Sequence, residues 1–248
     1  MNKILSIKNI SKDYHTINGE VSAIKDISLD INENEIIGIV GPSGCGKSTL
    51  LSILSGIEKA SGGSIIGDKK NYSYMLQSDA LLPWLNILDN AAIGLDIKNI
   101  KTKENIDYIK KLLTNFGLSS FLKAYPNNLS GGMRQRVALV RTLATKPDII
   151  LLDEPLSALD YVTRLTISDD IYRLVKSTNV TTILVTHDIA ECVSMCDRVV
   201  VLTKRPCIVK SIHEIKLKNK RLPSENRKDE LFNYYYDLVW GDLDKDIS

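Results

Sequence analysis

The nine residues from Gly41 to Thr49 read GPSGCGKST and combine three glycines with one lysine and a serine-threonine pair. A glycine, four residues and then Gly46-Lys47-Ser48 is the spacing of a phosphate-binding loop between a strand and a helix. Glycines let successive backbone N–H groups turn around an anion, and the following helix adds its positive dipole end. We expect Lys47 to reach the β- and γ-phosphates and Ser48 to bind Mg²⁺. A plain glycine-rich turn explains neither the lysine nor the hydroxyl pair. The predicted phosphate site comprises Gly41, Pro42, Ser43, Gly44, Cys45, Gly46, Lys47, Ser48 and Thr49.

Two adjacent carboxylates, Asp153 and Glu154, end the apolar run Ile149–Leu152. A carboxylate at the tip of a buried strand is costly unless it serves a cation or a proton. Asp153 is predicted to hold Mg²⁺ through the water shell of the ion. Glu154 is predicted to face the γ-phosphate and to polarise the attacking water as a general base. The alternative is a solvated acidic pair at the start of a loop.

A second candidate anion site lies in LSGGMRQR, residues Leu129 to Arg136. Ser130 is predicted to cap a helix that begins with Gly131 and Gly132. A helix N-terminus with a serine hydroxyl and bare glycine backbone suits a phosphate. No lysine or Mg²⁺ ligand accompanies it, so taken alone it could be only a well-capped helix.

Strands and helices alternate along the chain. A parallel α/β sheet is therefore expected, with ligands beyond the carboxyl ends of its strands. An antiparallel β region is expected to precede it and to lead into the loop. Residues Lys103 to Phe116 have helical spacing, and Gly117 is the expected stop. The strand-like runs are Ile4–Ile7, Ile24–Ile31, Glu35–Val40, Ile149–Leu152, Thr182–Val185 and Val199–Leu202.

Length and composition narrow the class of protein. The 248 residues suffice for one sizeable core, and a net charge of +2 gives no strong field for nucleic acid. Lysines interrupt the first residues too early for a signal peptide, and no apolar run reaches 18 residues, so a cytosolic chain is expected.

The cysteines lack paired metal-ligand spacing and are predicted to be free thiols, with Cys192 and Cys196 packed on one helix face. The four are Cys45, Cys192, Cys196 and Cys207.

Over residues about 1–210 the chain resembles the ATP-binding subunits of ABC transporters. The resemblance implies a P-loop NTPase of ABC type, with a mixed sheet core, an antiparallel β subdomain and a helical subdomain at about 84–140. It also implies ATP and Mg²⁺ as cofactors and ATP hydrolysis as the activity. The motifs stand in the family's order: residues 41–49, Gln77 after Tyr-Met-Leu, Leu129–Gln135, Ile149–Glu154, Ser157–Asp160 and His187 in VTHD.

The same resemblance implies a head-to-tail homodimer with two ATP sites. Ser130 and Gly132 of one chain then complete the site opposite Lys47 of the other, which explains why the second cradle has no lysine. The remaining roles also follow from the resemblance. Tyr14 stacks on adenine, Gln77 touches Mg²⁺ and the attacking water, His187 contacts the γ-phosphate and Asp160 aligns the protomers. Plain packing for Tyr14 and helix capping for His187 are the alternatives.

Residues Ala80–Leu95 and Asp197–Pro206 resemble the importer branch that serves nitrate, aliphatic sulfonates, taurine and thiamine-precursor pyrimidines. This implies a separate transmembrane permease, an extracellular solute-binding protein and a peripheral position at the cytoplasmic face of the membrane. The permease is expected to contact the segment from Gln77 to Leu85, where Trp84 is the expected anchor. The alternative is that the four large apolar side chains fill a seam between subdomains: Leu81, Leu82, Trp84 and Leu85.

Two departures from that branch bear on local structure. Few residues separate Gly63 from Gln77, so a tight hairpin is expected around residues 67–70. Cys207 stands where the branch has glycine, which leaves that turn open.

The chain is expected to divide into an ABC ATPase domain, residues 1–210, and a C-terminal tail, residues 211–248. Tail residues Leu231, Tyr235, Leu238 and Val239 fit one face of a short helix. This helix is expected to dock on its own domain. Lysines precede it, so a membrane-surface contact is the alternative.

Two other classes of function fit part of the sequence. A non-transport ABC ATPase acting on ribosomes or nucleic acid would have a second cassette, a coiled-coil insert or a basic face, and none is visible. A small-molecule kinase on the same loop would leave LSGGMRQR and His187 unexplained.

Overall fold

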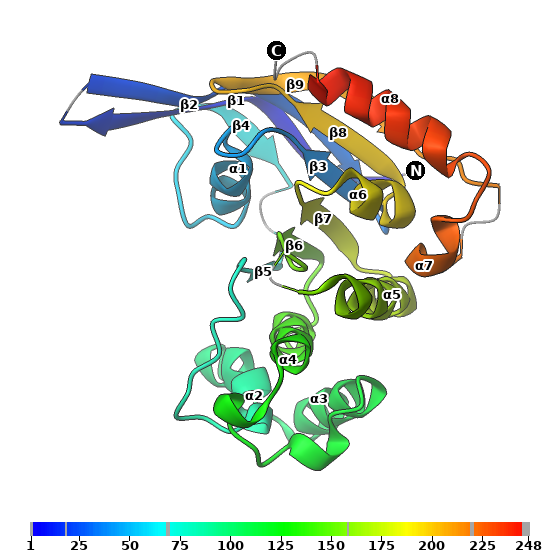
Figure 1. Ribbon diagram of the computed structural model, residues 1–248. Coiled ribbons are helices and arrows are strands. Elements are labelled where there is room, and N and C mark those ends of the chain that lie inside the picture. Colours follow the sequence, from blue (N-terminus) through cyan, green and yellow to red (C-terminus); the bar gives the residue numbers. More distant parts are fainter. Residues whose placement is uncertain (1, 18, 68–69, 158, 219–220, 245–248) are drawn as a thin grey trace.

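A nine-stranded sheet runs through the molecule (Figure 1), in the order β4-β1-β2-β9-β8-β3-β7-β6-β5. The structure is a computed structural model that describes residues 2–17, 19–67, 70–157, 159–218 and 221–244. Strands β3, β5, β6, β7 and β8 are parallel, whereas β1, β2 and β4 pair antiparallel. The strands are β1 Lys3–Thr16, β2 Gly19–Asn32, β3 Ile36–Val40, β4 Gly62–Ile66, β5 Tyr72–Met75, β6 Ile149–Asp153, β7 Thr181–Val185, β8 Arg198–Leu202 and β9 Cys207–Glu214.

Both faces of the parallel strands are covered, as their continuous apolar runs predict. Every residue of β3, β6 and β7 is buried. Ile37 and Ile39 of β3 pack in the cluster that contains α1 and the antiparallel strands. Ile36 and Val40 point the opposite way, into the cluster formed with most of the other helices. The fold class expected from the sequence is confirmed.

The helices lie in distinct places around this sheet (Figure 1). Helix α1 follows β3, while α2, α3 and α4 form a separate group at the bottom of the view, beyond β5 and β6. Helix α8 lies along β8 and β9. The helices are α1 Lys47–Leu54, α2 Ile87–Ile97, α3 Lys103–Asn115, α4 Gly131–Leu143, α5 Tyr161–Thr178, α6 Ile189–Met195, α7 Pro223–Asn226 and α8 Phe232–Asp244, with short 3₁₀ turns at Ser119–Phe121 and Pro126–Asn128.

Two local expectations need correction. The hairpin expected around residues 67–70 does not form, because β4 pairs with β1 whereas β5 pairs with β6. Residues 68–69 of that turn lie outside the described residues. Strands β1 and β2 are also longer than their apolar runs, since their antiparallel ladder continues through polar residues to Thr16 opposite Gly19.

The C-terminal tail is packed on the rest of the chain. Strand β9 crosses residue 210, so the division proposed there falls inside a strand that pairs with β8. Phe232, Val239 and Leu243 of α8 are buried, and their spacing places them on one face of the helix. Docking on the domain is therefore confirmed, but Leu238 lies outside the buried face at 37% exposure.

All four cysteines are buried free thiols, as expected. Cys192 and Cys196 pack against Gly38, where an added Cβ would lie 2.6 Å from the Cys192 Sγ. Cys207, the first residue of β9, lies beside Gly46 in the phosphate loop. These thiols fill space between strands and helices.

Candidate functional site

The phosphate loop joins β3 to α1, as predicted. Lys47 is buried and its Nζ donates to the carbonyl oxygens of Gly41 and Pro42, at 2.8 and 3.0 Å. Gly46 precedes α1 and no side chain caps the helix there, which leaves its first N–H groups for an anion. The φ of Gly46 is +128°, and a Cβ would lie 3.1 Å from the Ala23 carbonyl oxygen. Only glycine fits this position.

Three predicted catalytic side chains converge at the ends of neighbouring parallel strands. The Oε2 of Glu154 accepts a hydrogen bond from Gln77 Nε2 at 3.1 Å and lies 3.2 Å from His187 Nδ1. Gln77 follows β5, Glu154 follows β6 and His187 follows β7. Glu154 has φ +45°, an uncommon conformation for a side chain of its size, and its N–H donates to the Val185 carbonyl. The structure therefore brings these three residues together.

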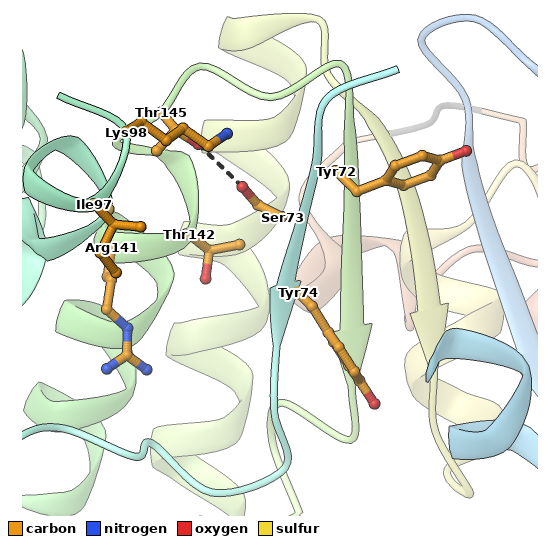
Figure 2. A pocket seen from close by; sticks show the side chains of 9 residues that line it. Tyr72, Ser73, Tyr74, Ile97, Lys98, Arg141, Thr142 and Thr145 are labelled. Atoms are coloured by element: carbon orange, nitrogen blue, oxygen red, sulfur yellow. Dashed lines mark hydrogen bonds between the residues drawn. The ribbon is translucent and has the colours of Figure 1, made fainter. Parts of the chain in front are cut away.

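Asp153 is held by a tyrosine that the sequence motifs do not reveal. Its Oδ2 accepts from the Tyr74 hydroxyl at 2.9 Å. Burial, and then the Asp153 carboxylate, raise the pKa of Tyr74 far above its usual value, so the hydroxyl remains a donor. Figure 2 shows Tyr72 and Tyr74 on the side of β5 opposite Ser73. Strand alternation could have placed Tyr74, but its partner lies 79 residues away.

The candidate Mg²⁺ ligands have the right chemistry for a hard cation. Hydroxyl, carboxylate and amide oxygens come from Ser48, Asp153 and Gln77, and Ser48 is exposed at the start of α1. Among the described residues no cluster of three His, Cys, Asp or Glu side chains could hold an ion. A few protein oxygens with phosphate and water oxygens are typical of Mg²⁺ bound with a nucleotide, so the residues fit.

Tyr14 lies beside α1, near the phosphate loop. Its hydroxyl donates to Glu58 at 2.8 Å, and Thr49 Oγ1 is 3.4 Å away. The hydrogen bond from Tyr14 lowers the pKa of Glu58. Lys12 Nζ lies 4.8 Å from the centre of the Tyr14 ring. Adenine stacking on Tyr14 stays a prediction.

Ser130 caps α4, as predicted, and accepts from the Met133 N–H at 3.3 Å. Asp160 caps α5 in the same way, accepting from the Thr163 N–H at 3.0 Å. The Thr163 hydroxyl lowers the pKa of Asp160 by hydrogen bonding to it. Gly132 packs against Thr163, and a Cβ there would lie 2.8 Å from the Thr163 methyl group. The two exposed caps therefore belong to neighbouring helices.

Helix α4, which Ser130 caps, lies apart from α1, the helix that follows the phosphate loop (Figure 1). In Figure 1, α4 belongs to the lower group of helices, whereas α1 lies against the upper strands. The structure therefore does not bring Ser130, Gly131 and Gly132 together with Lys47 in one chain.

The segment after Gln77 is fastened to the helical group. Arg141 of α4 donates to the carbonyl oxygens of Asp79 and Ala80 at 2.6 and 2.7 Å, and Arg134 Nε donates to the Asp79 carboxylate at 2.8 Å. Asn90 of α2 holds the Leu82 backbone through two hydrogen bonds. The two arginine anchors could not be found from motifs, because they join residues more than 50 positions apart in sequence.

A cavity of about 230 Å³ is lined by residues of β5, by residues of α2 and α4, and by Lys98 and Thr145. Figure 2 shows Ser73 and Thr145 joined by a hydrogen bond at its wall, with Lys98 and Arg141 on the helical side. None of the predicted nucleotide residues lines it.

The apolar surface expected between Gln77 and Leu85 is smaller than predicted. Trp84 is 70% exposed. The neighbouring leucines are half-buried, and Leu81 packs against the large core cluster. The alternative that these apolar side chains fill a seam between subdomains therefore holds for Leu81 and not for Trp84.

A buried carboxylate lies beneath the His187 loop. Glu191, on the first turn of α6, is 2% exposed and accepts from Thr186 Oγ1 at 2.7 Å. Its pKa is raised to about 7, chiefly by burial and in addition by Asp188, while the Thr186 hydrogen bond and the charges of Arg164 and Arg227 oppose the rise. Glu191 belongs to none of the sequence motifs.

We expect Glu191 to make stability depend on pH. The folded carboxyl keeps its proton up to about pH 7, whereas an unfolded glutamate loses it near ~4.3. The native state thus binds more protons between these values, so the free energy of unfolding falls as pH rises through them. Urea unfolding of Glu191→Gln between pH 5 and pH 8 should show a flatter dependence than wild type, whereas exposed Glu225→Gln should not. Parallel curves for wild type and Glu191→Gln would contradict the shift.

Residues 24–157 match the family described as ABC transporter. The chain belongs to this family. The ABC subunit is 36% identical to nitrate transport protein NasD of Klebsiella oxytoca, over 83% of this chain and 82% of the relative. It is 34% identical to taurine import ATP-binding protein TauB of Roseobacter denitrificans, over 94% of each chain.

Structural similarity agrees with this assignment. A dimeric structure of a post-hydrolysis state of the ATP-binding cassette MJ0796, bound to ADP and Pi, superposes with a TM-score of 0.75 and 31% identity. It covers 86% of this chain and 99% of that chain. The ABC subunit binds and hydrolyses ATP, and the hydrolysis is coupled to transport. The kinase alternative is thereby excluded. Within the described part of the chain, no helix is long and apolar enough to cross a membrane.

Proposed function

We propose that this ABC subunit energises uptake of a small solute of the nitrate, sulfonate, taurine or pyrimidine-precursor type through a separate permease. The observation that carries the catalytic part is the convergence of Gln77 and His187 on Glu154. The relatives named for nitrate and taurine transport support the importer assignment and the solute class.

Each side chain then has a defined task. Lys47 leaves the carbonyl oxygens of Gly41 and Pro42 and donates to the β- and γ-phosphates, while the loop N–H groups surround them. Glu154 accepts a proton from the attacking water, and Gln77 and His187 orient that water. Ser48, Asp153 and Gln77 would hold Mg²⁺, which supplies charge neutralisation at the phosphates when bound.

We propose a head-to-tail homodimer in which each ATP lies between two chains. Its support is the separation of α4, which Ser130 caps, from α1 within one chain (Figure 1), together with the dimeric cassette that this chain resembles. Ser130, Gly131 and Gly132 then face the phosphates held by the partner's loop, and Asp160 faces the partner. Two equivalent sites follow from two-fold symmetry.

We further propose that the subunit is peripheral on the cytoplasmic face of the membrane, with the permease docked at Gln77 to Leu85. An extracellular solute-binding protein completes the complex on the other side. Trp84 supports this surface, because a large exposed apolar side chain on a fastened loop suits an interface anchor.

Reconstitution tests the function directly. ATP hydrolysis by the purified subunit should rise when the permease encoded with it is added in proteoliposomes. Uptake should then be measured with nitrate, taurine and an aliphatic sulfonate, and with spermidine, which one further relative is named for. Uptake of spermidine alone would overturn the solute class, and hydrolysis unaffected by any permease would overturn the importer function.

Trp84→Ala should weaken permease association while the soluble subunit stays folded. Because the side chain is 70% exposed, its removal opens no cavity in the core. Truncating an interface anchor of this kind costs about 2 kcal/mol or more, roughly 30-fold in affinity. Pull-down with the permease, basal ATPase rate and transport measure the three expected results: weaker binding, an unchanged rate and reduced uptake.

The other tryptophan provides the control. Trp240 on α8 is 49% exposed and distant in sequence from the proposed surface, so Trp240→Ala should leave permease association intact. If Trp84→Ala melts well below wild type and still assembles normally once folded, Trp84 is a structural residue and the docking surface lies elsewhere.

A further inference from the structure

The buried carboxylate of Glu191 has no part in the convergence at Glu154, yet it is connected to residues on both sides of His187. Its Oε2 accepts from the hydroxyl of Thr186, and that hydroxyl also accepts from the Asp188 N–H at 3.0 Å. Thr186 is further tied to β3 through its N–H and the Ile39 carbonyl. Glu191 is therefore connected, through the Thr186 hydroxyl, to the backbone on both sides of His187.

One guanidinium joins this cluster to the segment that ends at Asp160. Arg164, one turn into α5, donates from Nη2 to the Leu159 carbonyl oxygen at 3.2 Å. Its Nη1 donates to Asp188 Oδ2 at 3.3 Å, and its Nε lies 3.8 Å from Glu191 Oε1. Leu159 immediately precedes the α5 cap, and Asp188 immediately follows His187.

We propose that Arg164 is a positioning residue that couples Leu159 and Asp160 to the loop from Thr186 to Asp188, which carries His187. This inference rests on the proposed function, in which Asp160 faces the second chain and His187 faces the γ-phosphate. Docking of the second chain against Asp160 moves the Leu159 carbonyl, and the planar fork of Arg164 passes that movement to Asp188 and Glu191. His187 then takes its working position only when the dimer has closed.

The geometry of the fork supports this role. The Arg164 Nε is buried and has no hydrogen-bond acceptor among the described residues. At 3.8 Å the distance from this nitrogen to Glu191 Oε1 is too long for a hydrogen bond. A small shift of α5 can shorten it, so the cluster has room for a second arrangement.

The C-terminal tail packs against the helices that carry Arg164 and Glu191. Helix α7 packs on α5 and α6, where Asn226 donates to the Ser194 carbonyl at 2.7 Å and Ser224 Oγ donates to Asp169 at 2.7 Å. The charge of Arg227 also favours the ionised form of Glu191. The charged groups around Glu191 thus come from α5, from the loop before α6 and from the tail.

Arg164→Lys tests the coupling, because lysine keeps the charge but cannot make three contacts in one plane. We expect the turnover number to fall about tenfold to a hundredfold, since a misplacement near 1 Å can cost that much. The KM for ATP should stay within twofold, because Arg164 touches none of the phosphate-loop residues. Arg173→Lys on the same helix, whose side chain is 58% exposed, is the control and should behave as wild type.

Hydrogen exchange supplies a readout that a purely structural role would not change. In a Glu154→Gln background, ATP-dependent dimer formation should protect residues 186–191, and Arg164→Lys should abolish that protection while dimers still form. Glu191→Gln keeps the shape of the side chain and should give the same pattern if Arg164→Lys fails to fold.

The coupling would be overturned if residues 186–191 were protected equally in Glu154→Gln and in Glu154→Gln with Arg164→Lys. It would also be overturned if Arg173→Lys lost as much turnover as Arg164→Lys. Absence of any ATP-dependent dimer would overturn the proposed dimer and this inference with it. The two failures are distinguishable, because only the second removes the dimer.

Discussion

Glu154→Gln is expected to retain ATP affinity while ATP hydrolysis falls by about 10²- to 10⁴-fold, the range of a general acid-base contribution. The substitution removes the proton acceptor and little else. A glutamine in this position can still accept the hydrogen bond that Gln77 Nε2 now donates to Oε2. The phosphate loop at Lys47 and the carboxylate of Asp153 are unaffected, so nucleotide binding should persist.

A second consequence is accumulation of the nucleotide-bound dimer. If each ATP lies between two chains and is no longer consumed, size-exclusion chromatography with ATP should show a stable dimer. Glu104→Gln is the matched control, because this glutamate on α3 is 86% exposed and remote from the nucleotide motifs. Turnover of Glu154→Gln within twofold of wild type would contradict the assignment of Glu154 as the base.

Local sequence patterns predict the buried parallel strands closely. The runs Ile149–Leu152 and Thr182–Val185 match β6 and β7 to within one residue, because strands covered on both faces are mostly apolar. The missing residues, Asp153 and Thr181, are polar. The β1 ladder extends well beyond Ile7, since cross-strand backbone hydrogen bonds continue where side chains are polar. Strand partners were harder to predict. The short link from β4 to β5 suggested a hairpin, but the choice of β1 and β6 as partners is non-local.

The same distinction holds for the candidate site. Motif order indicated that Gln77, Glu154 and His187 belong together, and parallel strands ending at one edge place them there. The residues that hold these groups carry no local signature. Tyr74 meets Asp153, and Arg164 meets Glu191, across long stretches of chain. Such partners become visible only when the strand order and helix packing are known.

Ser130→Arg is expected to abolish hydrolysis, by about 10²-fold or more, while the isolated monomer still binds ATP with normal affinity. A helix N-terminus that donates to a phosphate in the transition state acts like other preorganised donors, whose loss costs about 10²- to 10³-fold. Ser130 caps α4, and α4 lies apart from α1 (Figure 1), so a bulky side chain there is expected to leave the phosphate loop of its own chain unobstructed. Isothermal titration with ATP and steady-state ATPase assays measure the two expectations.

Two controls separate the phosphate role from helix stability. Ser130 caps α4, and loss of such a cap costs about 0.5–2 kcal/mol. Ser130→Ala removes the cap without adding bulk, so its unfolding free energy measures that effect alone. Ser120→Arg adds the same side chain at another exposed serine of the helical group and should leave hydrolysis unchanged.

Mixing Ser130→Arg with Lys47→Ala then tests whether the site is shared. In a heterodimer of the two variants, one composite site combines both defects, and the other joins an intact phosphate loop to an intact Ser130 cap. Each variant alone has both sites damaged, so activity that returns on mixing requires residues from two chains in one site. Strictly cooperative sites would keep the mixture inactive, but ATP would still be trapped at the intact site of the heterodimer. Loss of ATP affinity in monomeric Ser130→Arg would instead mean that Ser130 binds the nucleotide of its own chain, and the head-to-tail arrangement would fail.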